Sequence, residues 1–448
     1  MKVLRARWLW TGHALIEDGA LQFGADGLLV DVDRFEPLAE RNAGAAPVED
    51  LGDALLMPGL VNAHSHAFQR AFRGHVQWRQ ATSAADHGDF WTWRDAMYRA
   101  ANALDAEAVS EVSRRCFVEM IEAGITHVGE FHYLHHDQAG QPYADPDELA
   151  RRVIAAAREV GLRITLLRVV YGAGGVGEAL RPEQRRFATR SPDEALAAVA
   201  RLRQTGDACV TVGLAPHSIR AVPPAWLAEL AGFDGPIHAH VAEQPAEVAA
   251  CKAAWGRGPL EMFADAGLVD QRFTAVHLTW PEPGDPALLR RAGARVCVCP
   301  STELDLGDGF LPLALREGVS LCLGSDSHAR IDLFAEARAL ELHARALAGR
   351  RNVMSPPGVR HGLAARLLRA ATLDGTAALG GAGEGLRIGQ PADCCAIDLD
   401  RPAAEGVPPL EAAVFVATPE WVRDVWVAGA RVVRGGRAVR NTAPLASR

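Results

Sequence analysis

The sequence predicts an α/β protein, a (β/α)8 TIM-like barrel with a small β-sandwich domain built from both chain ends. Three observations lead to this prediction. Apolar strand-like runs alternate with helical stretches through the middle of the chain, and short strands separated by turns occupy both ends. The 448 residues are 49% apolar, which is enough to bury a large core. Strands spaced by helices form parallel βα units, and eight such units close into a barrel.

The predicted barrel rests on eight candidate strands, most of them separated by helical patterns such as 147–160 and 333–348. A doubly wound open sheet is the alternative arrangement of such units. No G-x-G-x-x-G segment opens a helix after a first strand, so nothing supports dinucleotide binding and we prefer the barrel. The candidate strands are 60–66, 126–133, 163–171, 210–217, 236–243, 273–279, 295–301 and 319–326.

The two chain ends share a style of short apolar runs punctuated by Gly and Asp, which is typical of small β units. We expect residues 1–57 and 385–448 to form one β domain, which the chain leaves near Met57-Pro58-Gly59. The remaining residues, 58–384, are then the catalytic barrel domain.

Composition limits the classes of partner. The net charge of -8 gives no reason to expect nucleic acid or an anionic membrane. The eight cysteines are scattered without a CxxC pair, which suits a reducing compartment. No stretch approaches the roughly 20 apolar residues of a membrane helix, and the N-terminus does not resemble a signal peptide. We therefore expect a soluble cytoplasmic protein.

A His-x-His pair, His64 and His66, ends the first candidate barrel strand. The two-residue period of a strand places both side chains on one face, where they could hold a single metal ion. Taken alone, such a pair is more often an accident of the sequence. The metal interpretation therefore depends on further ligands at the ends of other strands.

Further candidate ligands do occur at strand ends, where TIM barrels carry their chemistry. The fifth candidate strand carries His240 near its end, the sixth carries His277 near its end, and Asp326 ends the eighth. Structural zinc sites favour cysteine, whereas three histidines and a carboxylate with room for water are typical of a catalytic site. A histidine alone could equally be a satisfied core residue, but the set together predicts a metal centre.

This pattern resembles the amidohydrolase superfamily of metal-dependent deaminases and hydrolases, over nearly the whole chain. Some members carry two metals bridged by a carboxylated lysine, but the only lysines here, Lys2 and Lys252, lie outside the candidate barrel strands. The resemblance therefore implies one Zn2+ per chain. The ligands that it implies are His64, His66, His240 and Asp326.

The types of residue suggest how such a site would work. A zinc-like ion lowers the pKa of bound water to roughly 7, and Asp326 can accept the water's proton. Glu243 lies three residues after His240, close enough to pass a proton to a leaving nitrogen, and His277 can stabilise developing charge or orient the water. Attack on a C=N carbon with loss of ammonia uses all of these groups.

Five separated segments resemble one branch of this superfamily, the N-formimino-L-glutamate deiminases of histidine breakdown. The resemblance implies hydrolysis of N-formimino-L-glutamate to N-formyl-L-glutamate and ammonia. Two alternatives are another superfamily deaminase acting on a purine, pyrimidine or guanidino compound, and a non-catalytic scaffold, which we rank last. The matching segments are 64–70, 90–99, 129–133, 215–220 and 240–244.

The expected substrate has two carboxylates and a formimino group, and the matching segments offer partners for each. The planar guanidinium groups of Arg94 and Arg220 suit carboxylates, although Arg94 could instead be a solvated helix residue. Tyr133 and His217 add hydrogen-bonding groups, although Tyr133 could be a core aromatic, and Gln69 can meet the formimino nitrogens. We expect no partner beyond this small molecule, with a homodimer left open.

Two positions depart from the family pattern. Trp280 stands where a second histidine often follows His277, and Asp305 stands where we expect Asn, which could alter the polarity of the pocket. The loop over about 67–100 is expected to act as a lid. Four further histidines are expected to be pocket-wall or surface residues, not a second metal site: His132, His135, His136 and His328.

Overall fold

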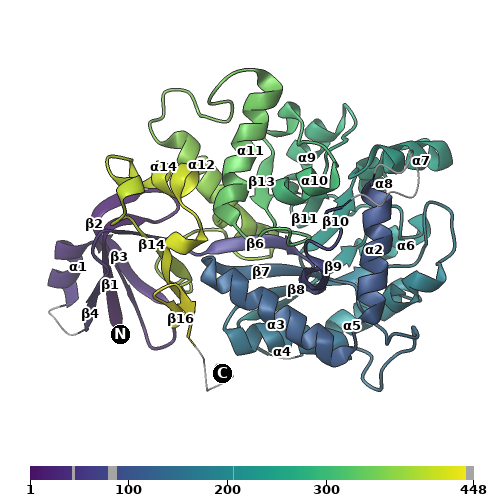
Figure 1. Ribbon diagram of the computed structural model, residues 1–448, viewed down its shortest axis with the longest axis horizontal. Helices are drawn as coiled ribbons and strands as arrows, with labels where there is room; N and C mark the ends of the chain where they lie inside the picture. The colour runs from purple at the N-terminus through teal and green to yellow at the C-terminus, as the bar shows by residue number, and fades with distance from the viewer. Residues whose placement is uncertain (43–45, 79–87, 205, 440–448) are drawn as a thin grey trace.

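Eight parallel strands form a barrel at the centre of the computed structural model, which describes residues 1–42, 46–78, 88–204 and 206–439 (Figure 1). Each strand pairs with the next along the chain. The barrel closes between its first and last strands, where Asp326 N donates to His64 O at 3.0 Å and His66 N donates to Asp326 O at 3.2 Å. The predicted barrel is confirmed. Its strands are β6 (Leu60–Ser65), β7 (Ile125–His132), β8 (Arg163–Val170), β9 (Val210–Pro216), β10 (Ile237–Val241), β11 (Phe273–His277), β12 (Arg295–Val298) and β13 (Ser320–Leu323).

All eight strands lie inside the predicted ranges to within a residue, but several end sooner than expected. The reason is visible in the backbone beyond them. Ala242, His277 and Asp326 have φ angles of 47°, 70° and 44°, in the left-handed region that non-glycine residues seldom occupy. The chain bends sharply at these residues, and the regular strands end at or just before them. Such strained backbone tends to gather at functional sites.

Helices surround the barrel, and they include the two that the sequence predicts (Figure 1). In α4, Leu149, Val153 and Ala157 recur every four residues and are buried, and Gly161 ends the helix in a left-handed conformation. In the part of the chain that the structure describes, no helix is long and apolar enough to span a membrane. The helices are α1 (Phe35–Asn42), α2 (Phe90–Ala103), α3 (Ala106–Glu122), α4 (Glu148–Val160), α5 (Pro192–Arg203), α6 (Pro224–Leu230), α7 (Pro245–Trp255), α8 (Pro259–Asp265), α9 (Asp285–Ala292), α10 (Pro300–Leu306), α11 (Leu333–Ala348), α12 (Gly362–Ala370), α13 (Leu373–Ala378) and α14 (Pro409–Glu411).

A separate β sheet is built from both chain ends, as predicted, and lies beside the barrel (Figure 1). The ends join where β5 pairs antiparallel with β14, so that Met57 lies opposite Cys395. Hydrogen bonds connect the strands into one continuous sheet and not into the two separate sheets of a simple sandwich. The strands are β1 (Lys2–Trp10), β2 (Leu15–Phe23), β3 (Leu29–Arg34), β4 (Val48–Asp50), β5 (Ala54–Pro58), β14 (Cys394–Asp398), β15 (Val422–Val427), β16 (Ala430–Arg434) and β17 (Arg437–Ala438).

The domain boundaries at 57/58 and 384/385 stay predictions. The end of the second segment, 440–448, lies outside the described residues.

Candidate active site and metal centre

Four predicted ligands converge at the carboxyl end of the barrel. His64 Nε2 lies 3.1 Å from His66 Nε2 and 3.2 Å from His240 Nε2. Asp326 Oδ1 lies 3.2 Å from His64 Nε2 and 3.1 Å from His66 Nε2. Ligand atoms about 2.0–2.1 Å from one zinc ion lie roughly 3.3 Å from one another in a tetrahedral site. The four side chains therefore surround a space that fits a single ion.

Hydrogen bonds on the far side of two imidazoles fix their tautomers. His66 Nδ1 donates to Phe131 O at 3.0 Å, and His240 Nδ1 donates to His217 O at 3.1 Å. A carbonyl oxygen only accepts, so each Nδ1 carries a proton and each Nε2 turns a lone pair toward the centre. Burial lowers the pKa of His64 to about 3 and holds that of His240 well below its usual value, so both rings are neutral. Converging lone pairs fit a bound cation.

The carboxylate of Asp326 has the charge that such a site needs. Burial alone would raise its pKa, but the contact with His64 holds the pKa well below its usual range. An ionised carboxylate beside neutral imidazoles is the protonation pattern of a metal site, since ligands bind in their deprotonated forms.

His277 lies beside this set. Its Nε2 lies 3.8 Å from Asp326 Oδ2 and 3.6 Å from Glu243 Oε1. A looser grouping, in which the ligand atoms of His64, His240, His277 and Asp326 lie within 4.8 Å of one another, would place it among the ligands. The shorter distances to His66 favour the predicted set. Burial opposes a charge on His277, but nearby carboxylates, Glu243 foremost, raise its pKa to about 10.

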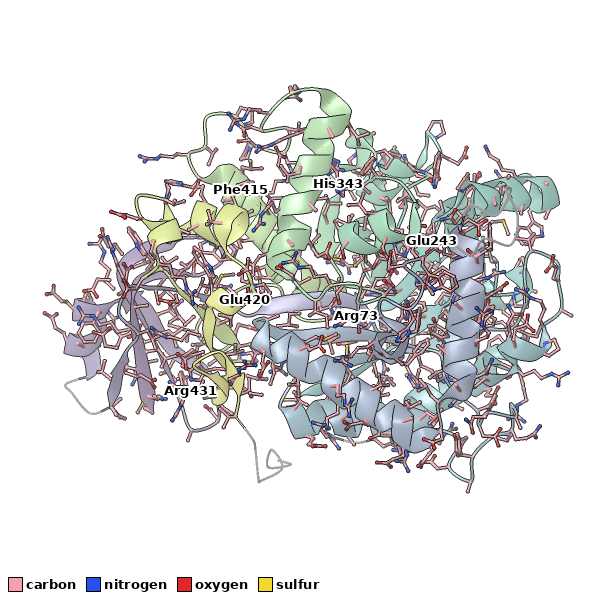
Figure 2. The ribbon with its side chains drawn as sticks, viewed as in Figure 1. Arg73, Glu243, His343, Phe415, Glu420 and Arg431 are labelled. Atoms are coloured by element: carbon pink, nitrogen blue, oxygen red, sulfur yellow. The ribbon has the colours of Figure 1, made fainter. Side chains whose placement is uncertain are left out.

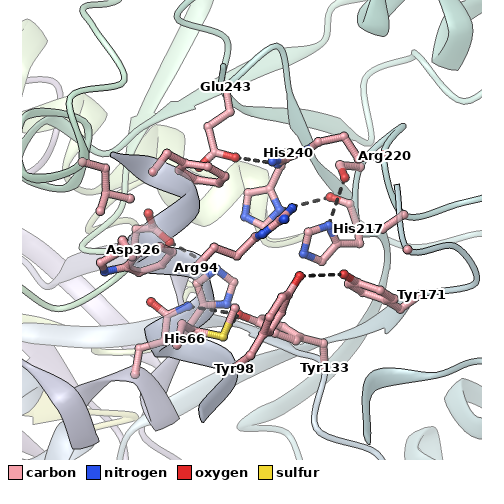
Figure 3. A pocket seen from close by; sticks show the side chains of 18 residues that line it. His66, Arg94, Tyr98, Tyr133, Tyr171, His217, Arg220, His240, Glu243 and Asp326 are labelled. Atoms are coloured by element: carbon pink, nitrogen blue, oxygen red, sulfur yellow. Dashed lines mark hydrogen bonds and ion pairs between the residues drawn. The ribbon is translucent and has the colours of Figure 1, made fainter. Parts of the chain in front are cut away.

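A pocket opens onto the metal ligands (Figure 3). Glu243, which lines it, sits at the barrel, far from Arg431 in the β domain (Figure 2). All five residues predicted to bind substrate also line this pocket, although they come from segments spread over some 150 positions of the chain. They are Gln69, Arg94, Tyr133, His217 and Arg220.

Arg94 reaches this pocket from α2 as a cation without a carboxylate partner. Its Cζ lies 4.5 Å from the ring centre of Trp91 and 5.6 Å from that of Tyr98, which are cation–π distances. Its Nε is buried without a hydrogen-bond partner. Among the described residues, no Asp or Glu forms an ion pair with Arg94. This guanidinium is therefore free to receive an anion.

Arg220, in contrast, already has two carboxylate partners. Its Nη2 donates to Glu243 Oε2 at 2.6 Å, and its Nε lies 3.5 Å from Glu247 Oε2. Burial opposes the charge, but Glu247 and Glu243 raise the pKa of Arg220. An incoming carboxylate must therefore share Arg220 with Glu243 or displace it, whereas the sequence suggested two equivalent arginines.

Glu247 is a site residue that the sequence analysis missed. It is buried at the start of α7, and its Oε2 accepts a hydrogen bond from Glu243 N at 3.2 Å. One carboxylate thus fixes both the backbone of Glu243 and the guanidinium of Arg220. Its place four residues after Glu243, with Pro245 opening a helix between them, was the signal that could have found it.

The remaining predicted pocket residues contact one another. Gln69 Nε2 donates to Tyr133 OH at 3.0 Å, and His217 Nδ1 lies 3.0 Å from Ser218 Oγ. The Tyr133 ring packs edge-on against His66 and His217, with ring centres 5.1 and 5.6 Å apart. Tyr133 is thus both a core aromatic and a pocket residue, whereas the sequence analysis treated these as alternatives.

A buried polar network behind the metal ligands was also missed. Ser65 Oγ donates to Glu130 Oε2 at 2.6 Å, and Ala67 N donates to Glu130 Oε1 at 2.8 Å. Ser65 Oγ also lies 3.2 Å from His328 Nε2. Burial raises the pKa of Glu130 to about 7. Glu130 therefore braces the backbone that presents His64 and His66.

The expectation that the four extra histidines are pocket-wall or surface residues is wrong for most of them. His132, His135 and His328 are buried, and none of the four lines this pocket. His135 Nε2 lies 3.0 Å from Val169 O, and His328 Nδ1 lies 3.0 Å from Ser325 Oγ. His136 is half-buried and lies 3.0 Å from Ala188 O.

The two family departures lie outside the pocket lining. Trp280 Nε1 donates to Asp308 O at 2.7 Å, and Asp305 accepts a hydrogen bond from Gln77. The segment over about 67–100, which stays a predicted lid, includes most of α2, while its middle part, 79–87, lies outside the described residues.

Comparisons with known proteins agree on one family. The model of the amidohydrolase family matches residues 55–432. A formimidoylglutamate deiminase from Pseudomonas aeruginosa is 38% identical over 444 residues, 96% of this chain and 95% of that protein. The crystal structure of an amidohydrolase from Brucella melitensis has a TM-score of 0.87 at 34% identity, covering 98% of this chain and 96% of that one. An adenosine deaminase from Xanthomonas campestris, solved with bound zinc, has a TM-score of 0.79 at 26% identity and covers 98% and 94%.

Proposed function

The chain belongs to the amidohydrolase family and is a hydrolase of carbon–nitrogen bonds, and we propose that it converts N-formimino-L-glutamate and water into N-formyl-L-glutamate and ammonia. The observation that carries this proposal is Arg94, a cation without a carboxylate partner in the pocket that contains the metal ligands. A planar base has no need of it, whereas the side-chain carboxylate of a glutamate does. The similarity to the deiminase from Pseudomonas aeruginosa supports the same substrate.

For the cofactor, we propose one Zn2+ per chain, held by His64, His66, His240 and Asp326. The zinc reported with the related adenosine deaminase supports the choice of metal. When bound, such an ion would act as a Lewis acid and make water acidic enough to lose a proton at neutral pH. His64 and His240 are neutral and Asp326 is ionised, as metal ligands must be.

The chain's own residues would handle the protons. Asp326 would accept one proton from the attacking water, whose oxygen forms a bond to the carbon of the protonated formimino group as the C=N bond becomes single. Glu243 would then take the proton of the new hydroxyl group and pass it to the terminal NH2, so that the bond between this nitrogen and carbon breaks, ammonia leaves and the formyl C=O forms. His277, 3.6 Å from Glu243 and 3.8 Å from Asp326, would stabilise the charge that develops between them. General acid–base groups of this kind contribute on the order of 10²–10⁴ in rate.

In the same proposal, Arg94 receives the side-chain carboxylate and Arg220 receives the α-carboxylate by exchanging its contact with Glu243. That exchange would release Glu243 to face the formimino group. Gln69, Tyr133 and His217 would complete the pocket. We also propose the two-domain division at 57/58 and 384/385, a cytoplasmic location and action without nucleic acid.

Ammonia release from a small panel of substrates tests the proposed function. The zinc-loaded protein is assayed with N-formimino-L-glutamate, adenosine, 5-methylthioadenosine and a guanidino acid. We expect kcat/KM for N-formimino-L-glutamate to exceed the others by at least about a hundredfold, the effect of two charge-assisted contacts. Preference for either nucleoside would instead identify the chain as a purine deaminase.

A further inference from the structure

A fully buried glutamine, Gln184, ties together part of the pocket wall. Its Nε2 lies 3.1 Å from Tyr98 OH, 3.0 Å from Tyr171 OH and 3.2 Å from Gly174 O. Its Oε1 accepts a hydrogen bond from Arg181 N at 2.9 Å. A main-chain N–H only donates and a carbonyl only accepts, so the amide can face only one way. One of the two N–H groups of Gln184 faces Gly174 O, and the other is directed toward the two phenols.

This orientation constrains the phenolic protons. Because the Nε2 of Gln184 carries its own protons, neither tyrosine can donate to it. The hydroxyls of Tyr98 and Tyr171 are 3.3 Å apart, and only one proton can lie between them (Figure 3). Burial raises the pKa of Tyr171 well above its usual value, so it keeps its proton. One of the two hydroxyl protons is therefore left without an acceptor, since no other side chain or carbonyl among the described residues accepts it.

The spare hydroxyl lies on the wall that also carries Arg94. Tyr98 and Tyr171 line the pocket, and Tyr98 follows Arg94 by one turn of α2. The Cζ of Arg94 lies 5.6 Å from the Tyr98 ring centre. A cation and a neutral O–H donor near each other, neither with an acidic partner, form a receptor suited to a carboxylate.

We propose that the Tyr98–Tyr171 pair donates a hydrogen bond to the substrate carboxylate that Arg94 binds, with the direction of its protons set by Gln184. This inference deepens the proposed function and rests on it. Tyr98 and Tyr171 are binding residues in this scheme. Gln184 does not reach the substrate and is a positioning residue.

The experiment compares two substrates that differ only at the distal group. N-formimino-L-glutamate carries the carboxylate, and N-formimino-L-norvaline has a methyl group in its place. For the double variant Tyr98→Phe/Tyr171→Phe, we expect kcat/KM to fall about tenfold to hundredfold on the first compound and to change less than about twofold on the second. Tyr143→Phe is the matched control, because Tyr143 lies outside the pocket lining.

Gln184→Met tests the positioning role. It keeps an unbranched side chain of similar size but removes the donor that directs the phenols. We expect a higher KM for N-formimino-L-glutamate, a nearly unchanged kcat and no effect on the norvaline compound. The control is Gln138→Met, since Gln138 also binds α2, donating to Ala103 O at 3.0 Å, but is exposed and lies outside the pocket.

Binding of the product N-formyl-L-glutamate, measured by calorimetry on zinc-loaded protein, gives a readout that does not need turnover of the norvaline compound. The double Phe variant should bind the product about tenfold more weakly or worse, at an unchanged Tm. Equal losses on both substrates, or unchanged product affinity, would overturn the inference. If the wild type acts on neither formimino compound, the proposed function itself fails.

Discussion

At the scale of single residues, Glu243 is the group whose role is easiest to isolate. Its Oε1 lies 3.6 Å from His277, it pairs with Arg220, and it lies outside the tight set of ligand atoms. Glu243→Gln keeps the size and shape of the side chain, but an amide cannot deliver the proton that the carboxyl group would deliver. We expect kcat to fall by about 10²–10⁴ while zinc content by elemental analysis stays at one per chain. Loss of zinc in this variant would make Glu243 a ligand or its essential support.

The two arginines should respond differently to substitution. Arg94→Met should lower kcat/KM for N-formimino-L-glutamate about tenfold to hundredfold and spare the norvaline compound. Arg220→Met should impair both compounds, because it also leaves Glu243 and Glu247 buried without their cation. Arg94→Lys should restore little of this kcat/KM, since an ammonium group cannot form the two parallel hydrogen bonds of a planar guanidinium. Equal losses on both compounds for Arg94→Met would show that the side-chain carboxylate is bound elsewhere.

A buried carboxyl away from the site, Glu336 on α11, makes stability depend on pH. Burial raises its pKa from 4.5 to about 8. Below pH 4.5 this carboxyl is protonated in both the folded and the unfolded chain. As the pH rises from 4.5 toward 8, it ionises readily only in the unfolded chain, so the folded protein loses stability between these two pH values. Glu336→Gln removes this loss. The Tm difference between variant and wild type should therefore increase from pH 4.5 to 8, by roughly a few degrees.

The exposed-residue control for that comparison is Glu317→Gln, whose Tm curve should run parallel to that of the wild type. A parallel curve for Glu336→Gln as well would show that this carboxyl does not oppose folding at high pH.

At the scale of elements, the metal site depends on the seam where β6 meets β13. Gly324 lies in that seam, and a Cβ there would come within 2.8 Å of both His64 Cβ and His64 O and within 2.9 Å of Cys299 Sγ. Gly324→Ala should therefore push His64 out of place and lower zinc affinity by at least about tenfold, measured by chelator competition. Gly232→Ala, with nothing within 4 Å of the added Cβ, is the control. Unchanged affinity in the first variant would mean that the seam can relax.

The positions of strands and helices decide which parts of the site the sequence could predict. His64, His66, His240 and Asp326 were predictable because each sits at the end of an apolar run, and parallel strands bring their ends together. The pairing of Arg220 with Glu247 was not, since it requires α7 to turn its first residues back toward β9.

Gln184 was beyond prediction for a related reason. It comes from a short 3-10 helix, Pro182–Phe187, in a long connection whose path no hydrophobic period describes.

At the scale of the whole molecule, the barrel and the sheet from the chain ends have separate tasks. Every residue assigned to the site lies between 64 and 326, within the range of the barrel strands and their loops. The sheet joins the two ends of the chain through β5 and β14 and leads directly into β6. We therefore expect substitutions in the sheet to affect stability before they affect selectivity.

The measurement that tests the central claim most directly is product analysis by NMR on protein stripped of metal and then titrated with zinc. N-formyl-L-glutamate and ammonia should appear in equal amounts from N-formimino-L-glutamate, and the rate should rise with zinc until one ion is bound per chain. Metal-free protein should be inactive. Release of L-glutamate and formamide, or full activity without metal, would contradict the account.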